Sequence, residues 1–250
     1  AHGLVGSEMC IRDRYMSMGI TAENVAKKFN ISRKEQQDFA ISSHSKANLA
    51  RESNLFDNEI VSITNNDEKI NKDGGIRPNT SHEILDGLKL AFDENGTVTA
   101  GTASPLTDGA SAVIVCEEEY AKKNNLNILA RIKSTAVVGC PPELMGLGPI
   151  NASKKALKRA NLSITDIDIV ELNEAFASQS LACIKELNMD INKVNIHGGA
   201  IALGHPLGAT GARITGKVAT LLQNNNKKYG LATQCIGLGQ GIATVLENIN

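Results

Sequence analysis

The sequence predicts an α/β protein in which strands and helices alternate in layers. From about residue 127 onward, short apolar runs and helical stretches follow one another in the order βαβαβαββ, which is typical of a layered α/β fold. Residues 109–117 also resemble residues 241–247, because each is an apolar run that leaves a glycine turn. Two copies of one half-fold would explain this repeat, with the first copy cut off at its start. Chance likeness between two buried strands is the alternative.

Composition narrows the class of protein. The 250 residues carry a net charge of −1, with 42% hydrophobic and 21% charged residues, as is ordinary for a globular chain. The near-neutral charge, the 3% aromatic content and the lack of tryptophan predict no nucleic-acid or membrane partner. We expect neither a membrane span nor a signal peptide. The five cysteines lack disulfide or zinc-ligand spacing, so we expect no metal and a cytoplasmic protein.

Caps and turn residues divide the chain into elements. Residues 1–14 have neither caps nor a sustained apolar face, and we expect a foreign or disordered tract there. Thr21 caps a short helix, and Ser32 with Glu35 forms a capping box that opens a longer one. Residues 52–91 are polar and predict a loop-rich excursion. The expected helices are 21–28, 32–51, 117–125, 149–160, 174–187 and 208–223. The expected strands are 60–63, 96–101, 109–116, 128–138, 167–172, 194–196, 230–236 and 241–247.

His205 lies in the glycine-dense stretch 198–211, just before the last expected helix. Pro206 cannot donate a backbone hydrogen bond, and Gly204 and Gly208 admit backbone angles that other residues resist. Such a loop approaches a ligand closely, and the N–H groups of the helix that starts near Gly208 favour negative charge there. A neutral imidazole in this place can deprotonate a thiol or hold an oxyanion. The alternative is a loop histidine that bonds a carbonyl.

Cys235 ends an apolar strand at a glycine turn. A thiol there could serve as an acid or base once its pKa is tuned, and the N–H of Gly237 could meet a developing oxyanion. An inert buried cysteine is the alternative. The glycine spacing is not G-x-G-x-x-G and a strand follows rather than a helix, so we reject a dinucleotide site.

Asn173 stands where a strand meets a helix. It could hold a polarising water or a carbonyl in the crevice beyond the carboxyl end of the strand, or it could be a helix N-cap. Cys116, Cys140 and Cys183 are interpreted as packing residues. We expect His197 to stabilise the loop that follows it.

Three motifs, present together in this order, resemble the catalytic motifs of the thiolase family. They are Asn173-Glu-Ala-Phe176, Gly198-Gly-Ala-Ile-Ala-Leu-Gly-His205-Pro-Leu-Gly208 and Cys235-Ile-Gly-Leu-Gly-Gln-Gly241. Residues 18–26 and 145–150 also match, and the likeness runs from about Tyr15 to Glu247. Within the family, the sequence is most similar to the acetyl-CoA acetyltransferase branch.

The resemblance implies a thiolase-like layered fold, duplicated as two βαβαβαββ halves with a loop domain inserted in the first. Residues 15–122 would hold the loop domain and the tail of a truncated N-terminal half. Residues 123–250 would form the complete C-terminal domain. Family members are usually dimers or tetramers, so the resemblance also implies a homo-oligomer.

The resemblance implies roles as well. His205 would activate a nucleophilic cysteine, and Cys235 would remove an α proton from a second acetyl-CoA or return it during cleavage. Asn173, through a bound water, and His205 would stabilise the enolate oxygen, while the N–H of Gly237 would form half of another oxyanion hole. No cofactor would be bound permanently, since CoA thioesters are the substrates. Positions that match family contacts to CoA are Met18, Arg77, Ala100, Ser104, Met145 and Phe176.

One departure from the family bears on activity. The family nucleophile lies in a Cys-x-Ser-Gly type of motif that this sequence lacks, and Cys10 is followed by Ile11-Arg12 without a strand-to-helix setting. We therefore expect the isolated chain to be inactive. The reaction expected of the whole enzyme is condensation of two acetyl-CoA to acetoacetyl-CoA, or its reverse. The alternatives are a 3-ketoacyl-CoA thiolase of fatty-acid β-oxidation and a non-catalytic acyl-CoA-binding relative.

Overall fold

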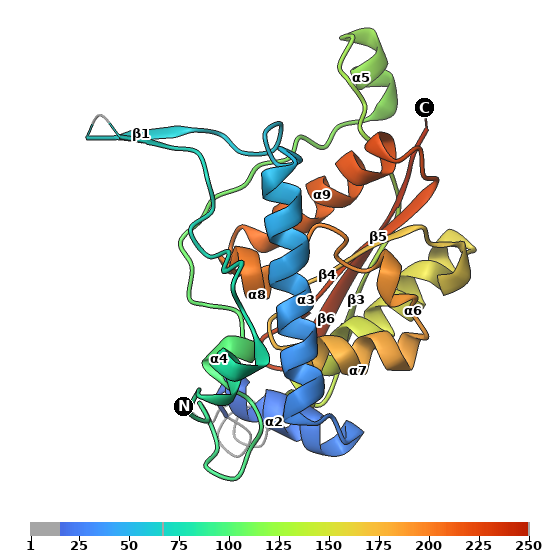
Figure 1. Cartoon of the computed structure of the whole chain (residues 1–250). Coiled ribbons are helices and arrows are strands. Elements are labelled where there is room, and N and C mark those ends of the chain that lie inside the picture. Colours follow the sequence, from blue (N-terminus) through green and yellow to red (C-terminus); the bar gives the residue numbers. More distant parts are fainter. Residues whose placement is uncertain (1–15, 67, 250) are drawn as a thin grey trace, which may run out of the picture.

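A four-stranded sheet organises the C-terminal part of the chain (Figure 1). The computed structural model describes residues 16–66 and 68–249. The strands are Arg131–Gly139 (β3), Ile169–Leu172 (β4), Tyr229–Ile236 (β5) and Gln240–Glu247 (β6). Their spatial order is β3-β6-β5-β4, in which β6 is antiparallel to both neighbours and β4 is parallel to β5. The order follows from the sequence because β5 and β6 form a hairpin, whereas a parallel pair needs a long crossover.

Helices cover both faces of this sheet. Helices α6 (Gly148–Ala160) and α7 (Ala177–Leu187) pack on one face, and α9 (Thr210–Asn224) packs on the other. Successive strand side chains point to opposite faces, so Val170 joins the core with α6 and α7, while Ile169 joins the core with α9. All of β4 is buried as a result. The expected layered α/β fold is confirmed.

Helix α2 (Met18–Phe29) begins earlier than the sequence predicted. The side chain of Ser17 accepts a hydrogen bond from the backbone N–H of Ile20 at 3.4 Å and caps the helix. Thr21 is therefore not the cap but a buried residue of the first turn, whose hydroxyl donates to Met18 O at 2.7 Å. Either hydroxyl suits an N-cap, and only the position of the first turn separates them.

Helix α3 (Arg33–Glu52) starts at the capping box that the sequence predicted. The hydroxyl of Ser32 accepts from the backbone N–H of Glu35 at 3.2 Å, and Glu35 Oε2 accepts from the backbone N–H of Ser32 at 2.7 Å. The helix packs against α7 and the short helix α8 (Ala200–Leu203). It therefore connects the N-terminal part of the chain to the sheet domain (Figure 1).

The polar excursion contains little regular structure, as expected, but its strand lies elsewhere. Residues 60–62 are not a strand; instead β1 (Ile63–Asn65) pairs with β2 (Glu68–Ile70) in a short hairpin that extends away from the sheet (Figure 1). A five-residue helix follows, α4 (His82–Asp86). The register pairs Ile63 with Ile70, and the apolar pattern alone did not locate it.

Two expected strands, 96–101 and 109–116, do not form. Thr99 makes only an isolated bridge to Leu90, and residues 100–102 form a 3-10 turn. Residues 109–116 have no regular structure and are exposed. No strand of the described chain lies beside them, and an extended segment without a partner leaves its ladder hydrogen bonds unmade. Residues 109–117 and β6 therefore differ in structure despite their similar sequences.

The stretch before α9 also departs from expectation. The strand expected at 194–196 is reduced to one parallel bridge, Val194 to Val170. Helix α8 interrupts the glycine-dense loop, and α9 starts at Thr210 rather than near Gly208. The other expected elements lie within a few residues of their predicted bounds, including α5 (Glu118–Lys123).

Candidate active site

The candidate site lies at the carboxyl ends of the parallel strands β4 and β5. Asn173 directly follows β4, and its backbone N–H donates to Thr233 O of β5 at 3.0 Å. Cys235 lies two residues farther along β5. The carboxyl edge of parallel strands is where α/β proteins place ligand sites. The fold thus brings the carboxamide-bearing and thiol-bearing segments to one edge of the sheet.

Asn173 has a buried side chain without a protein partner. Only 1% of the residue is exposed, and neither Oδ1 nor Nδ2 has a hydrogen-bond partner among the described atoms. Helix α7 begins four residues later, with Phe176 as its N-cap, so the helix-cap interpretation of Asn173 is wrong. A buried amide with both polar atoms unpaired costs free energy. A bound water or the polar atom of a ligand would satisfy it.

The thiol of Cys235 lies in an apolar cluster. The residue is 8% exposed and packs with Met145 and Phe176, two of the residues expected to contact CoA. Burial raises the pKa of the Cys235 thiol to about 12. The group is therefore a protonated thiol at neutral pH, able to give up its proton only to a strong base.

A tight turn follows Cys235 and holds Gly237 in place. Leu238 has a left-handed φ of 67° and Gly239 a φ of 90°. A side chain at Gly239 would collide with the carbonyl oxygen of Cys140, so the turn rests on the chain after β3. A left-handed leucine costs roughly 1–3 kcal/mol, and such strain concentrates at functional sites. A Cβ at Gly237 would lie 3.1 Å from Cε of Met18, another predicted CoA contact.

His205 is half-buried and fixed at two points. Its backbone N–H donates to Thr107 Oγ1 at 3.2 Å, and its Nδ1 lies 2.7 Å from Thr210 Oγ1. Burial, aided by the positive charge of Arg213, lowers the pKa of His205, so its ring is neutral at pH 7. The N–H of Thr210 donates to Pro206 O at 2.9 Å. This N–H at the start of α9 is therefore used within the loop.

One loop connects His205 to the segment after β4. Ala103 forms an antiparallel bridge with Phe176, and the N–H of Ser104 donates to Ala175 O at 3.0 Å. Three residues later, Thr107 holds the backbone of His205. Ser104, a predicted CoA contact, therefore lies beside Phe176.

The two other predicted CoA contacts, Arg77 and Ala100, are exposed and precede Ala103 in the chain. Ala100 begins the 3-10 turn before Ala103. Arg77 donates its backbone N–H to His44 Nδ1 at 3.1 Å. The excursion reaches the site region through Gly75, where a Cβ would lie 2.7 Å from the carbonyl oxygen of Ala202 in α8.

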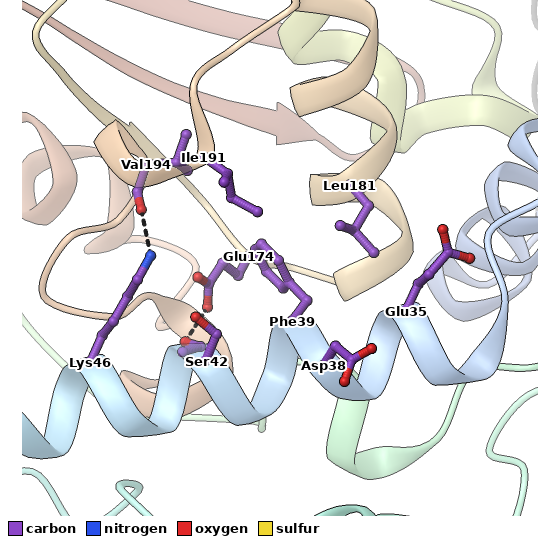
Figure 2. Close-up of a pocket in the computed structure, with 10 residues that line it drawn as sticks. Glu35, Asp38, Phe39, Ser42, Lys46, Glu174, Leu181, Ile191 and Val194 are labelled. Atoms are coloured by element: carbon purple, nitrogen blue, oxygen red, sulfur yellow. Dashed lines mark hydrogen bonds between the residues drawn. The ribbon is translucent and has the colours of Figure 1, made fainter.

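Glu174, which the sequence did not single out, is a buried carboxyl group that connects the site to α3. Its carboxylate accepts from Ser43 Oγ at 2.7 Å, from Asn195 Nδ2 at 2.8 Å and from the N–H of Ile201 at 3.1 Å. Burial raises the pKa of Glu174. Glu174 lines a pocket of about 240 Å³ together with Lys46. Figure 2 shows both side chains between α3 and the sheet domain. These three hydrogen bonds hold the segment from Asn173 to Phe176 against α3 and α8.

Two further residues near the site were not predicted from the sequence, Phe92 and Glu171. Phe92 packs edge-on against Phe176, with ring centroids 5.9 Å apart. Glu171, on β4, is buried with Oε1 unpaired, and burial raises its pKa to about 8. An aromatic residue in a chain with so few of them is a signal for Phe92. A glutamate inside an apolar strand is a signal for Glu171.

The remaining cysteines differ in setting. Cys183 is buried in α7 and burial raises its pKa, in keeping with a packing residue. Cys140 is half-buried. Cys116 is exposed, so the interpretation of Cys116 as a packing residue is wrong. Cys116 is the last residue of the expected strand 109–116, which does not form. Cys10 lies outside the described residues.

His197 packs edge-on against Phe56, with ring centroids 6.2 Å apart, and burial lowers its pKa to about 4. Within the described residues, no helix is long and apolar enough to cross a membrane, and no group of His, Cys, Asp and Glu could hold a metal ion.

Comparisons with known proteins point to one family. Residues 3–119 match the N-terminal domain of thiolase, and residues 126–248 match the C-terminal domain of thiolase. The chain is 54% identical over 239 residues to a 3-ketoacyl-CoA thiolase of Shewanella loihica and 52% identical over 241 residues to one of Serratia proteamaculans. These alignments cover 92% and 93% of this chain but 62% of each relative. The chain therefore spans about three fifths of the length of these relatives.

Solved structures of thiolases are also similar to this chain. The human mitochondrial 3-ketoacyl-CoA thiolase in complex with CoA superposes with a TM-score of 0.92 at 44% identity, over 95% of this chain and 60% of that one. The acetyl-CoA acetyltransferase of Bacillus anthracis superposes with a TM-score of 0.90 at 43% identity, over 93% and 60%.

Proposed function

Because the chain belongs to the thiolase family, we propose that it carries the proton-transfer and enolate-stabilising part of a 3-ketoacyl-CoA thiolase. The observation that carries the proposal is the unpaired amide of Asn173 at the same sheet edge as the thiol of Cys235. The relatives at 52–54% identity are named 3-ketoacyl-CoA thiolases. That name favours a broad-specificity enzyme over the acetyl-CoA acetyltransferase that the sequence resemblance put first.

Cys235 supplies the proton in this proposal. Thiolysis transfers the acyl group of a 3-ketoacyl-CoA to a cysteine nucleophile and leaves the enolate of acetyl-CoA, which must gain a proton at carbon. A thiol with a pKa of about 12 keeps its proton until such a strong base forms beside it. In the condensation direction the thiolate of Cys235 is a correspondingly strong base. Separating acyl transfer from carbon–carbon bond cleavage gives two easier steps.

Asn173 and His205 stabilise the enolate oxygen in the proposal. The Nδ2 group of Asn173 has no hydrogen-bond partner among the described residues, so it can bind a water or an oxyanion without breaking a hydrogen bond of the fold. The neutral ring of His205 can accept the proton of a nucleophilic thiol, and the ring that then carries this proton can donate a hydrogen bond to the enolate oxygen. The apolar cluster of Met145 and Phe176 around Cys235 excludes water from the developing charge.

The first experiment uses this chain and acetyl-CoA in D₂O. We expect the chain to exchange the acetyl α protons for deuterium, because exchange requires the base and the oxyanion donors but not acyl transfer. Cys235→Ala should lower the exchange rate at least about a hundredfold, in the range of general acid–base effects. Cys183→Ala, which removes another buried thiol, is the control. Exchange that survives Cys235→Ala would contradict the assigned role.

The second experiment separates the two thiolase activities. The chain and a version extended by any coding sequence upstream are assayed for thiolysis of acetoacetyl-CoA and of 3-ketohexadecanoyl-CoA. We expect no turnover by the chain alone, because the Cys-x-Ser-Gly motif is absent, and cleavage of both substrates by an extended version. Cleavage of acetoacetyl-CoA alone would support the acetyltransferase, a second candidate favoured by the likeness to the Bacillus anthracis enzyme.

We also propose that the protein is cytoplasmic and forms a homo-oligomer.

A further inference from the structure

One side-chain contact fixes the ring of His205. Oγ1 of Thr210 lies 2.7 Å from Nδ1 of His205. Thr210 is fully buried and is the first residue of α9, where its backbone N–H is held by Pro206 O at 2.9 Å. An imidazole has two nitrogens. The contact at Nδ1 therefore leaves Nε2 as the nitrogen that can act on another molecule.

The single hydrogen of the threonine hydroxyl decides the tautomer. Thr210 Oγ1 donates to Pro206 O at 3.0 Å. A hydroxyl carries one hydrogen; with that hydrogen on Pro206 O, Oγ1 meets Nδ1 of His205 as an acceptor at 2.7 Å, and Nδ1 carries the ring hydrogen. Nε2 of the neutral ring then presents a lone pair, the form that a general base requires. The β-branch of threonine restricts χ1 and keeps the hydroxyl in this orientation.

We infer that Thr210 is the positioning residue of His205, with its hydroxyl holding Nδ1–H so that Nε2 is the proton acceptor; this rests on the proposed function. Thr210 acts through His205 and does not touch the substrate. When a thiol gives up its proton, the S–H bond breaks and an Nε2–H bond forms, while Nδ1 keeps its hydrogen. The contact with Thr210 is the same before and after the step, so no reorganisation accompanies the transfer.

The test measures the tautomer directly in this chain. Long-range ¹H–¹⁵N spectra of the uniformly ¹⁵N-labelled protein are recorded from about pH 5 to pH 9, with His205→Gln to assign the ring. We expect a protonated Nδ1 and a bare Nε2 above the pKa of His205. Thr210→Val, which keeps the branched shape but loses the hydroxyl, should lose the bare-Nε2 signal to a mixture of tautomers. Thr210→Ser should restore it.

Thr215→Val is the matched control. Its hydroxyl lies on the same helix and donates to Gly211 O at 2.7 Å, so its loss should leave the signals of His205 unchanged. A wild-type ring with hydrogen on Nε2 would overturn the inference even if Thr210→Val failed to fold. So would Thr210→Val spectra identical to wild type.

The ring spectra of the wild type and of the Thr210 variants do not depend on turnover. Loss of α-proton exchange chemistry in every form of the protein would refute the proposed function and leave the tautomer intact. In an active form, Thr210→Val should lower kcat at least about tenfold with little change in KM and should shift the pH profile, while Thr210→Ser retains most activity. An unshifted profile would refute the positioning role alone.

Discussion

At the residue scale, burial makes different demands on two neighbouring groups. Burial disfavours the charged thiolate of Cys235, so the group keeps its proton and its pKa is raised. The amide of Asn173 has no such option, so its two polar atoms remain unpaired in the interior. The thiol is thereby made a weak acid whose thiolate is a strong base, and the amide is made receptive to a polar ligand atom.

The raised pKa of Cys235 predicts a slow reaction with iodoacetamide. A pKa of about 12 against an ordinary 9.0 lowers the thiolate fraction at pH 8 roughly a thousandfold. Cys116 is exposed, so it should be alkylated long before Cys235. Peptide mass spectrometry of the native protein at timed intervals measures both rates. Comparable rates in the native state would contradict the buried-thiol picture, and equal rates in urea provide the control.

The sequence singled out the residues that the proposed function uses but not those that contact them. His205 and Cys235 stand in glycine-rich motifs, and Asn173 stands where a strand meets a helix. Glu174 and Thr107 act through partners that are far away in the chain, such as Ser43 and His205. Contacts of this kind depend on the tertiary fold, and no local pattern reports them.

At the element scale, β4 carries a carboxyl group that couples stability to pH. Glu171 is buried, and its pKa of about 8 in the fold exceeds the ordinary value of 4.5 despite the opposing charges of Arg213 and Lys217. Folding therefore favours the protonated form. This stabilisation is complete below about pH 4.5 and is lost as the pH rises through about 8.

Glu171→Gln should flatten this dependence. The amide stays neutral, so the variant should gain thermal stability over wild type progressively as the pH rises from about 5 to 8. Melting temperatures measured across that range for both proteins provide the test. Glu186→Gln, at an exposed position of α7, should leave the curve parallel to wild type. A parallel curve for Glu171→Gln would show that the carboxyl is ionised in the fold.

A second element-scale prediction concerns the contact between β6 and α6. A Cβ at Gly241 would overlap the backbone of Gly148, so strand and helix meet without side chains between them. Gly241→Ala should lower the free energy of unfolding by about 1–3 kcal/mol, as overpacking does. Gly74→Ala, where a Cβ meets no atom within 4 Å, should change it by less than about 0.5 kcal/mol. Urea denaturation measures both; equal changes would refute the close approach.

The elements that the sequence predicted well have partners within the described chain. Strand β6 pairs with both β3 and β5, and α3 carries its own capping box. Residues 109–116 have an equally good strand pattern but no strand beside them. Sequence patterns report the capacity to form a strand, whereas a neighbouring strand decides whether the capacity is used.

At the scale of the whole molecule, residues 109–116 leave an apolar segment in solvent. Ile114 is 89% exposed and Val115 is 69% exposed. The segment touches α9 through Ser111 Oγ, which donates to Ala209 O at 2.6 Å, and a Cβ at Gly216 would lie 3.1 Å from Val113. Its strand-forming side chains and unpaired backbone are the features that promote association between chains.

We predict that the isolated chain self-associates through this segment. Wild type should form concentration-dependent oligomers, and a double variant with Ile114→Lys and Val115→Lys should approach the monomer mass of 26.6 kDa, because paired charges block strand addition. Light scattering after size-exclusion chromatography measures the mass over a range of concentrations. Val61→Lys replaces a valine that is 85% exposed in the loop before β1, and it should leave the oligomers intact. A discrete dimer or tetramer that survives the lysine pair would place the interface on another face of the molecule.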